Sequence, residues 1–263
     1  MTEPFSRQIE VSALFESRSH REALARLQLM VENRYLGLLT GEVGSGKSTL
    51  IRRLFQNLDS KLYHPVYIAK SNLKPRDFYA ELLRQVGEVP PFALPKAKQL
   101  WTEALETRRD QGDKALVVVV DEAQEMSDTM LGELRFVVGH QMDSCSLFPL
   151  ILVGQSELRR VLRLKKYEAI AQRIPLRYHL SGLDSAETAQ YIRHQISAAG
   201  LSTPVFSESA MVQVHAGSQG IPRLINQICT QGLYDAIQRG HEVIEESHIV
   251  RVLADYDRQR GTG

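Results

Sequence analysis

The sequence predicts an α/β fold, a parallel five-stranded sheet with flanking helices, followed by a small all-α domain. Up to about residue 180, short apolar runs alternate with stretches of helical periodicity, which is the pattern of βαβ units. No further strand-like run follows, and the charge balance changes at the same place. Residues 1–180 carry 26 basic and 22 acidic side chains, whereas residues 181–263 carry 6 basic and 9 acidic ones. We therefore expect a core domain at 1–180 and a helical domain at 181–263.

The strands are expected where apolar residues cluster. The run at 115–120 is continuous and β-branched, which is typical of a strand buried on both faces. The five expected strands cover 35–40, 65–69, 115–120, 147–153 and 174–180. Helices are expected at 47–57, 77–87 and 101–109 in the core, and at 208–215, 222–239 and 245–256 after it.

Two local signals bound these helices. Asp184 with Glu187 three residues later forms a capping box that begins another helix of the second domain. Pro90, Pro91 and Pro95 predict a non-helical loop before the helix at 101–109.

Composition excludes several classes of protein. The chain has 263 residues, of which 43% are hydrophobic and 24% charged, and its net charge is +1. This composition excludes a disordered protein and a protein that binds nucleic acid over its whole surface. Two cysteines, Cys145 and Cys229, cannot form a disulfide framework, and packing is their expected role. The eight histidines show no metal-binding spacing. No apolar run is long enough to span a membrane, and residues 1–8 lack a signal-peptide core, so a cytoplasmic protein is expected.

The strongest motif lies between the first expected strand and the first expected helix. It reads G-x-x-x-x-G-K-[ST], the pattern of a loop whose glycines let backbone N–H groups turn toward phosphates. In this pattern Lys47 reaches the β- and γ-phosphates and Ser48 offers its hydroxyl to Mg²⁺. A chance glycine-rich turn is the alternative, and the flanking strand and helix argue against it. The expected nucleotide-binding residues are Gly41, Glu42, Val43, Gly44, Ser45, Gly46, Lys47, Ser48 and Thr49.

A second motif ends the apolar strand at 115–120 with two adjacent carboxylates, Asp121 and Glu122. In open α/β sheets, ligands bind at the carboxyl ends of the strands. We expect Asp121, together with Ser48, to hold Mg²⁺ and to contribute to nucleotide binding. We expect Glu122 to polarise the attacking water.

Three more residues are candidates for catalytic contacts with the γ-phosphate or the lytic water. Gln155 lies just past the fourth expected strand, where a plain strand end is the alternative. Arg173 precedes the fifth strand and would reach a neighbouring subunit's γ-phosphate as an arginine finger. Arg177 is its rival, and a surface arginine is the alternative. Arg223 follows Pro222 in the first turn of an expected helix, where a cation opposes the helix dipole, so a bound anion is favoured.

The order of these motifs resembles that of AAA+ ATPases, and several segments resemble the ExeA-type group more narrowly. That group spans secretion-pathway ATPases and the transposition regulators TniB, TnsC and MuB. The similar segments, spread between Pro4 and Tyr256, are Pro4-Phe5, Ser19-His20-Arg21-Glu22-Ala23-Leu24, Gly41-Glu42-Val43-Gly44, Asp121-Glu122-Ala123-Gln124 and Val153-Gly154-Gln155-Ser156-Glu157-Leu158.

The resemblance implies ATP as the nucleotide, a lid formed by the second domain, and nucleotide sites shared between subunits of a homo-oligomer. Hexameric rings and helical filaments are both known in such proteins. It also implies that His20 lies near the adenine, with a satisfied helix start as the alternative. Asn, Ser or Thr is frequent at the position of Gln155 in AAA+ proteins, so this chain departs from the pattern there.

Basic residues suggest a surface for duplex DNA. Lys70, Lys74 and Arg76 follow the second strand, where the resemblance favours contact with DNA phosphates. A solvated basic face is the alternative. From residue 159 to residue 177 there are seven basic side chains and one acidic one, for which a solvated face or a subunit interface is favoured.

These observations lead to one function and two alternatives. The expected function is a DNA-binding ATPase that assembles on duplex DNA, helps a transposase select target sites and is disassembled by hydrolysis. The first alternative is a secretion-pathway assembly ATPase that acts on protein clients. ExeA-type secretion members continue into a membrane segment and an envelope domain, and the end of the chain at Gly263 disfavours this alternative. The second is a nucleotide-gated binding module with negligible turnover.

Overall fold

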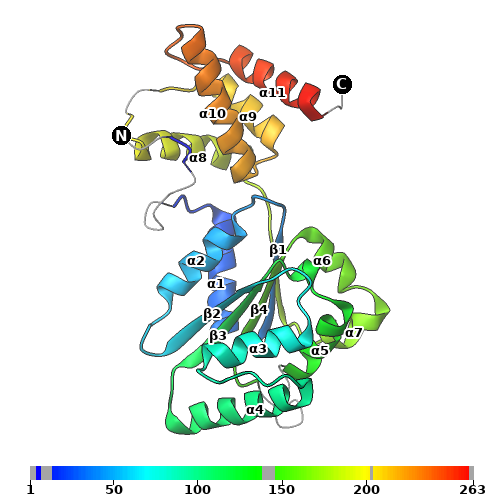
Figure 1. The fold of residues 1–263 in the computed structure, drawn as a ribbon. Coiled ribbons are helices and arrows are strands. Elements are labelled where there is room, and N and C mark those ends of the chain that lie inside the picture. The colour runs from blue at the N-terminus through cyan, green and yellow to red at the C-terminus, as the bar shows by residue number, and fades with distance from the viewer. Residues whose placement is uncertain (1–3, 7–13, 138–145, 202–203, 261–263) are drawn as a thin grey trace. The chain divides into compact units, whose positions relative to one another are not determined.

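A computed structural model describes residues 4–6, 14–137, 146–201 and 204–260 (Figure 1). Contacts divide the chain into two units. The sheet unit comprises Glu22–Gly41 and Lys47–Leu180, and the helical unit comprises Met1–Arg21, Glu42–Gly46 and Ser181–Gly263. Cys145, expected to be a packing residue, lies outside the described residues.

The sheet unit contains five parallel strands in the order β2-β3-β4-β1-β5. The predicted α/β fold with a parallel five-stranded sheet is therefore confirmed. The strands are β1 (Leu36–Gly41), β2 (Tyr63–Ala69), β3 (Ala115–Asp121), β4 (Leu150–Gly154) and β5 (Leu176–Leu180). The helices and short 3-10 turns of this unit are α1 (Arg18–Glu32, begun in the helical unit), α2 (Lys47–Asn57), α3 (Pro75–Gln85), α4 (Leu94–Gln111), η2 (Ala123–Glu125), α5 (Asp128–Val137), α6 (Ser156–Val161), η3 (Lys165–Tyr167) and α7 (Glu168–Ala171).

Both faces of the sheet are buried, as the continuous apolar strands predict. Alternate residues of a strand point to opposite faces, so β3 contributes to two cores. Val118 and Val120 pack in the core that includes residues of α3, α4 and α5. Val117 and Val119 pack in the other core, with residues of α1 and α2.

Proline explains where the observed elements differ from the expected ones. Helix α4 begins at Leu94, before the expected start at residue 101, and Pro95 lies in its first turn. A proline is tolerated there because the N–H that it lacks would have no helical partner, so the prediction that Pro95 breaks the helix was wrong. Strands β4 and β5 begin at Leu150 and Leu176, each directly after a proline.

The helical unit has its own apolar core. Its helices are α8 (Ser185–Ala198), α9 (Glu208–Ser218), α10 (Pro222–Gln238) and α11 (Glu246–Arg260). The capping box is confirmed, because the Glu187 backbone N–H donates to Asp184 Oδ1 at 2.8 Å and the Glu187 side chain accepts from Asp184. Phe5 joins this core edge-on to Phe206, and Cys229 is fully buried in it.

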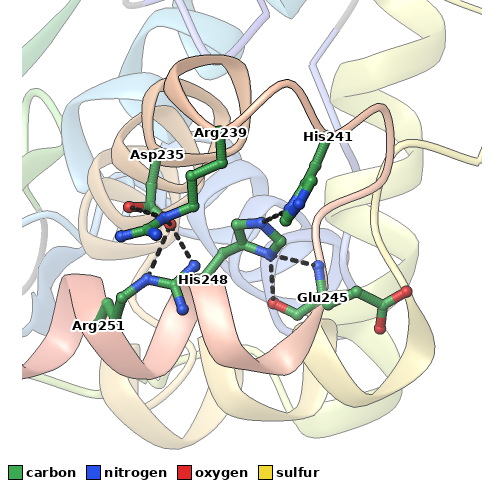
Figure 2. A network of polar contacts seen from close by, with 6 residues as sticks. All are labelled: Asp235, Arg239, His241, Glu245, His248 and Arg251. Carbon is green, nitrogen blue, oxygen red and sulfur yellow. Dashed lines mark hydrogen bonds and ion pairs between the residues drawn. The ribbon is translucent and has the colours of Figure 1, made fainter.

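Polar contacts connect α10, the turn after it and α11 (Figure 2). Asp235 accepts hydrogen bonds from Arg251 at 2.6 Å and from Arg239 at 3.2 Å. His248 is buried, and its Nδ1 accepts from the Glu245 backbone N–H at 2.9 Å. In a neutral ring Nε2 then carries the proton and donates to Nδ1 of His241 at 2.8 Å. These bonds fix the start of α11 against the end of α10.

No helix in the described ranges combines the length and apolar character needed to cross a membrane.

Candidate nucleotide-binding site

Three neighbouring strands of the sheet unit end at the same edge. Strand β4 lies between β1 and β3, with Thr40 paired to Gly154 and Val120 paired to Leu152. The phosphate-loop motif leaves β1, Asp121 ends β3, and Gln155 follows β4. Residues far apart in the sequence therefore meet at the carboxyl edge, where parallel sheets bind ligands.

The loop between β1 and α2 has the backbone shape that its glycines permit. Gly44 and Gly46 have φ angles of 85° and 100°, which L-residues rarely adopt. Ser45 Oγ is buried and has no hydrogen-bond partner among the described residues. A buried hydroxyl without a partner and a positive-φ turn leading into a helix N-terminus suit the binding of phosphate groups.

The two residues that open α2 point to the expected chemistry. Lys47 is buried, and its Nζ donates to the carbonyl of Gly41 at 2.8 Å. Ser48 Oγ donates to Asp121 Oδ2 at 3.3 Å. Asp121 is itself only 4% exposed. The structure thus brings Ser48 and Asp121, the expected metal ligands, into direct contact.

Tyr67 is a residue of this edge that the sequence analysis missed. Its hydroxyl donates to Asp121 Oδ2, the oxygen that also accepts from Ser48. Burial and the neighbouring Asp121 raise the pKa of Tyr67, so the phenol stays protonated as a donor. No motif in the sequence marks Tyr67, because its place depends on the pairing of β2 with β3.

Glu122 is held by two side-chain amides. Gln124 Nε2 donates to Glu122 Oε2 at 2.5 Å, and Gln155 Nε2 lies 3.4 Å from the same oxygen. The backbone N–H of Gln155 donates to Gln124 Oε1 at 2.9 Å. Glu122 has a φ of 51°, in the left-handed region. Gln124 was noted only as part of a similar segment, and the structure adds it to the candidate site.

His20 contacts the phosphate loop within the helical unit. Ser17 Oγ accepts from the His20 backbone N–H at 3.1 Å and lies 2.7 Å from His20 Nδ1, so Ser17 caps helix α1. The His20 side chain also hydrogen-bonds the backbone of Ser45. Burial lowers the pKa of His20, partly offset by Glu187 and by this bond to Ser45. The satisfied helix start, which was the alternative to a place near the adenine, is therefore present, and the same histidine contacts the phosphate loop. The place near the adenine stays a prediction.

Arg223 also lies against the loop within the helical unit. Its backbone N–H, near the start of α10, donates to the Gly44 carbonyl at 3.3 Å. A Cβ atom added to Gly44 would lie 2.6 Å from Arg223 Cβ. The backbone N–H of Arg223 therefore contacts the loop directly.

The remaining candidates have other partners or are exposed. Arg173 donates to the Ala169 carbonyl at 3.2 Å, at the end of α7. Lys70 forms an ion pair with Asp77 at 3.2 Å. Lys74 is exposed. Arg76 donates to the Phe92 carbonyl at 2.9 Å, and its guanidinium lies 4.5 Å from the centre of the Phe92 ring.

The residues present fit a magnesium–nucleotide complex. Mg²⁺ prefers oxygen ligands and usually keeps several waters, so one carboxylate and one hydroxyl suffice from the protein. Asp121 and Ser48 supply these two groups, and Lys47 supplies a buried cation at the start of α2. In the described part of the chain, no three His, Cys, Asp or Glu residues are grouped so that they could hold another metal.

The fold and this site define a P-loop NTPase. The sequence model of the AAA domain family matches residues 30–162, about half of the chain, and the chain belongs to this family.

Among curated proteins, the chain is 36% identical over 271 residues to "General secretion pathway protein A" of Aeromonas hydrophila. The match covers 98% of the chain and 48% of the relative, so the chain spans about half of that protein's length.

Solved structures with this fold include Cdc6p from Pyrobaculum aerophilum, with a TM-score of 0.68 and 18% identity, covering 91% of this chain and 67% of that one. Another is the ORC1 protein of Aeropyrum pernix in complex with DNA, with a TM-score of 0.65 and 17% identity, covering 95% and 68%. At such low identities these likenesses establish the fold alone.

Proposed function

We propose that this chain is a Mg²⁺-dependent ATPase whose assembly is controlled by nucleotide. The observation that carries the proposal is the geometry at the carboxyl edge of the sheet. Ser48 contacts Asp121 there. The buried Lys47 directly precedes Ser48 in the sequence, and Glu122 directly follows Asp121. Each part of phosphoryl-transfer chemistry has a residue of the required type.

The roles follow from the chemistry of the side chains. Lys47 places its positive charge on the β- and γ-phosphates of ATP. Ser48 and Asp121 hold Mg²⁺, which when bound neutralises charge on the phosphates. Glu122 accepts a proton from the attacking water, and Gln155 orients that water. The backbone of the remaining loop residues, up to Thr49, binds the phosphates. Positioning and electrostatics supply most of the rate enhancement in such sites.

Further residues would complete the site in a homo-oligomer. We propose that Arg173 reaches the γ-phosphate bound by a neighbouring subunit and that Arg223 responds to the nucleotide from the lid. His20 would contribute to nucleotide binding from the start of α1. A site shared between subunits couples ring or filament assembly to the nucleotide that is bound.

We favour protein clients of a secretion pathway as the target of this ATPase. The supporting observation is the relative named for the general secretion pathway, whose similarity extends over 98% of this chain. The sequence analysis favoured transposition and used the end of the chain as an argument against secretion. That argument has no weight, because the relative continues well beyond the matched part.

A DNA-bound transposition regulator that recruits a transposase remains the second candidate. It is supported by the exposed Lys74 beside Lys70 and Arg76, after strand β2. Lys70 is paired with Asp77 and Arg76 donates to the Phe92 carbonyl, so these two side chains have fewer hydrogen-bond donors left for DNA phosphates.

One experiment tests both the activity and the choice of client. ATP hydrolysis by the purified chain is measured with and without Mg²⁺ and duplex DNA, with Glu122→Gln as the control of low activity. Electron microscopy with a slowly hydrolysed ATP analogue accompanies it, with and without DNA.

We expect Mg²⁺-dependent turnover that Glu122→Gln lowers to a small residual rate and that DNA leaves unchanged. Turnover at the level of the control would refute the ATPase proposal and favour a nucleotide-gated binding module. DNA-stimulated turnover together with rings or filaments on DNA would replace the secretion proposal with the transposition one, and Lys74→Ala would be the next variant.

A further inference from the structure

We propose that Gln124 is a positioning residue for hydrolysis, which ties the carboxylate of Glu122 to the backbone that follows strand β4. The inference rests on the proposed ATPase and adds a residue to its machinery. Gln124 does not act on the nucleotide or on water. It acts through Glu122, by restricting where that carboxylate points.

The hydrogen bonds determine which way the Gln124 amide faces. Its Oε1 accepts from the backbone N–H of Gln155 at 2.9 Å, and its Nε2 donates to Glu122 Oε2 at 2.5 Å. With the amide rotated by half a turn, an NH₂ group would face an N–H donor and a carbonyl oxygen would face a carboxylate. Both contacts would then be repulsive, so the assignment follows from the partners.

The surroundings leave room for this arrangement. A Cβ atom added to Gly154 would lie 2.8 Å from Gln124 Oε1 and 2.9 Å from Leu158 Cδ2. Glycine at the end of β4 therefore lets the amide approach the backbone of Gln155 closely. Strand β4 ends directly before Gln155 and is paired on both sides, with β1 and with β3, so the amide is anchored to the end of a rigid element.

The bond from Gln124 is the shorter of the two side-chain contacts that hold the Glu122 carboxylate, because Gln124 Nε2 lies 2.5 Å and Gln155 Nε2 3.4 Å from the same oxygen. The backbone of Glu122 is in the left-handed region, with a φ of 51°, outside any regular helix or strand. A long side chain at such a turn samples several rotamers in solvent, and a general base must lie within hydrogen-bond reach of the water. The charge-assisted bond from Gln124 selects one orientation of the carboxylate.

The test uses Gln124→Met, which keeps the length of the side chain and removes its hydrogen bonds. We expect kcat to fall about tenfold or more, because a catalytic group displaced by about 1 Å can lose up to a hundredfold. We expect KM and the dissociation constant for ATP to stay within about twofold. The matched control is Gln99→Met, because Gln99 donates to Glu103 at 2.8 Å on the exposed face of α4, and it should change nothing.

A double-mutant cycle asks whether Gln124 acts through Glu122. In the Glu122→Gln background, the residual rate should be insensitive to Gln124→Met, since the group to be positioned is gone. A further tenfold loss in that background would overturn the inference. So would an effect of Gln124→Met on KM with kcat unchanged, which would indicate a role in binding.

Urea unfolding of the same four proteins separates this inference from the proposed function. If the wild-type chain does not hydrolyse ATP, the proposed function fails. The coupling free energy between positions 122 and 124 still reports the contact, and we expect it to be clearly different from zero. Additive effects of the two substitutions on stability would overturn the inference.

Discussion

The close approach of the phosphate loop to Arg223 makes a quantitative prediction about Gly44. Gly44→Ala adds a methyl group to a residue with φ of 85°, and that group would lie 2.6 Å from Arg223 Cβ. The left-handed conformation costs an alanine about 1–2 kcal/mol. The clash adds about 1–3 kcal/mol if nothing moves, so we expect the loop to shift instead.

ATP binding would then have to restore the original loop geometry, which makes the binding free energy less favourable by the same amount, about 1–3 kcal/mol. This corresponds to about fivefold to 150-fold weaker binding. The matched control is Gly87→Ala. Gly87 has the same φ of 85°, but no described atom lies within 4 Å of a Cβ built there. Gly87→Ala should therefore destabilise the fold only by the cost of the left-handed conformation and leave ATP affinity unchanged.

The assay is calorimetric titration of both variants with a slowly hydrolysed ATP analogue, together with urea unfolding. The reasoning predicts weaker binding for Gly44→Ala and wild-type binding for Gly87→Ala. If Gly44→Ala bound the analogue like wild type, the contact between the loop and Arg223 would not constrain the loop. If both variants lost affinity equally, the backbone conformation alone would explain the effect.

Three further predictions concern charged and titratable groups. Lys98 pairs with Glu133 at 2.6 Å, and Glu133 is only 8% exposed, so Lys98→Met should destabilise the sheet unit by about 2 kcal/mol in urea unfolding. Hydrogen bonds from Arg251 hold the pKa of Asp235 below its ordinary value, so its contribution to stability is present above that ordinary value and is lost as the pH falls through the lowered one. Urea unfolding from pH 5 to pH 2 should show this loss in wild type and a smaller one in Asp235→Asn. Burial lowers the pKa of His20, so the folded state favours the neutral ring, and stability in urea unfolding should fall as the pH is lowered from the ordinary histidine value to the depressed one and fall less in His20→Gln.

Controls separate these effects from general destabilisation. An exposed helical pair, Arg84 with Glu81, provides the comparison for Lys98, because Arg84→Met should change stability by only a few tenths of a kcal/mol. Equal losses in the two variants would contradict the importance of burial at Glu133. Identical acid profiles for wild type and Asp235→Asn would exclude Asp235 as the titrating group. A pH dependence in His20→Gln equal to that of wild type would exclude His20 as the titrating group.

Local sequence determined which elements form and which chemistry they carry. The phosphate-loop residues, the strand that ends at Asp121 and the capping box at Asp184 are each specified by residues within one or two turns of chain. Hydrophobic periodicity reports burial in the same local way, which is why the continuous β-branched run at 115–120 predicted a strand buried on both faces. Local sequence does not determine a boundary where a proline is compatible with either a loop or the first turn of a helix, as Pro95 is in α4.

Tertiary structure alone decided which side chains meet at the carboxyl edge. Tyr67 reaches Asp121 only because β2 pairs with β3 in one register, and Gln124 reaches Gln155 only because β4 lies beside β3. Strand order and register are set by packing over the whole sheet, and the periodicity of one segment does not indicate which strands pair with it. The sequence by itself therefore determined the identity of the expected nucleotide-binding groups, and the assembled sheet determined the hydrogen bonds that orient them.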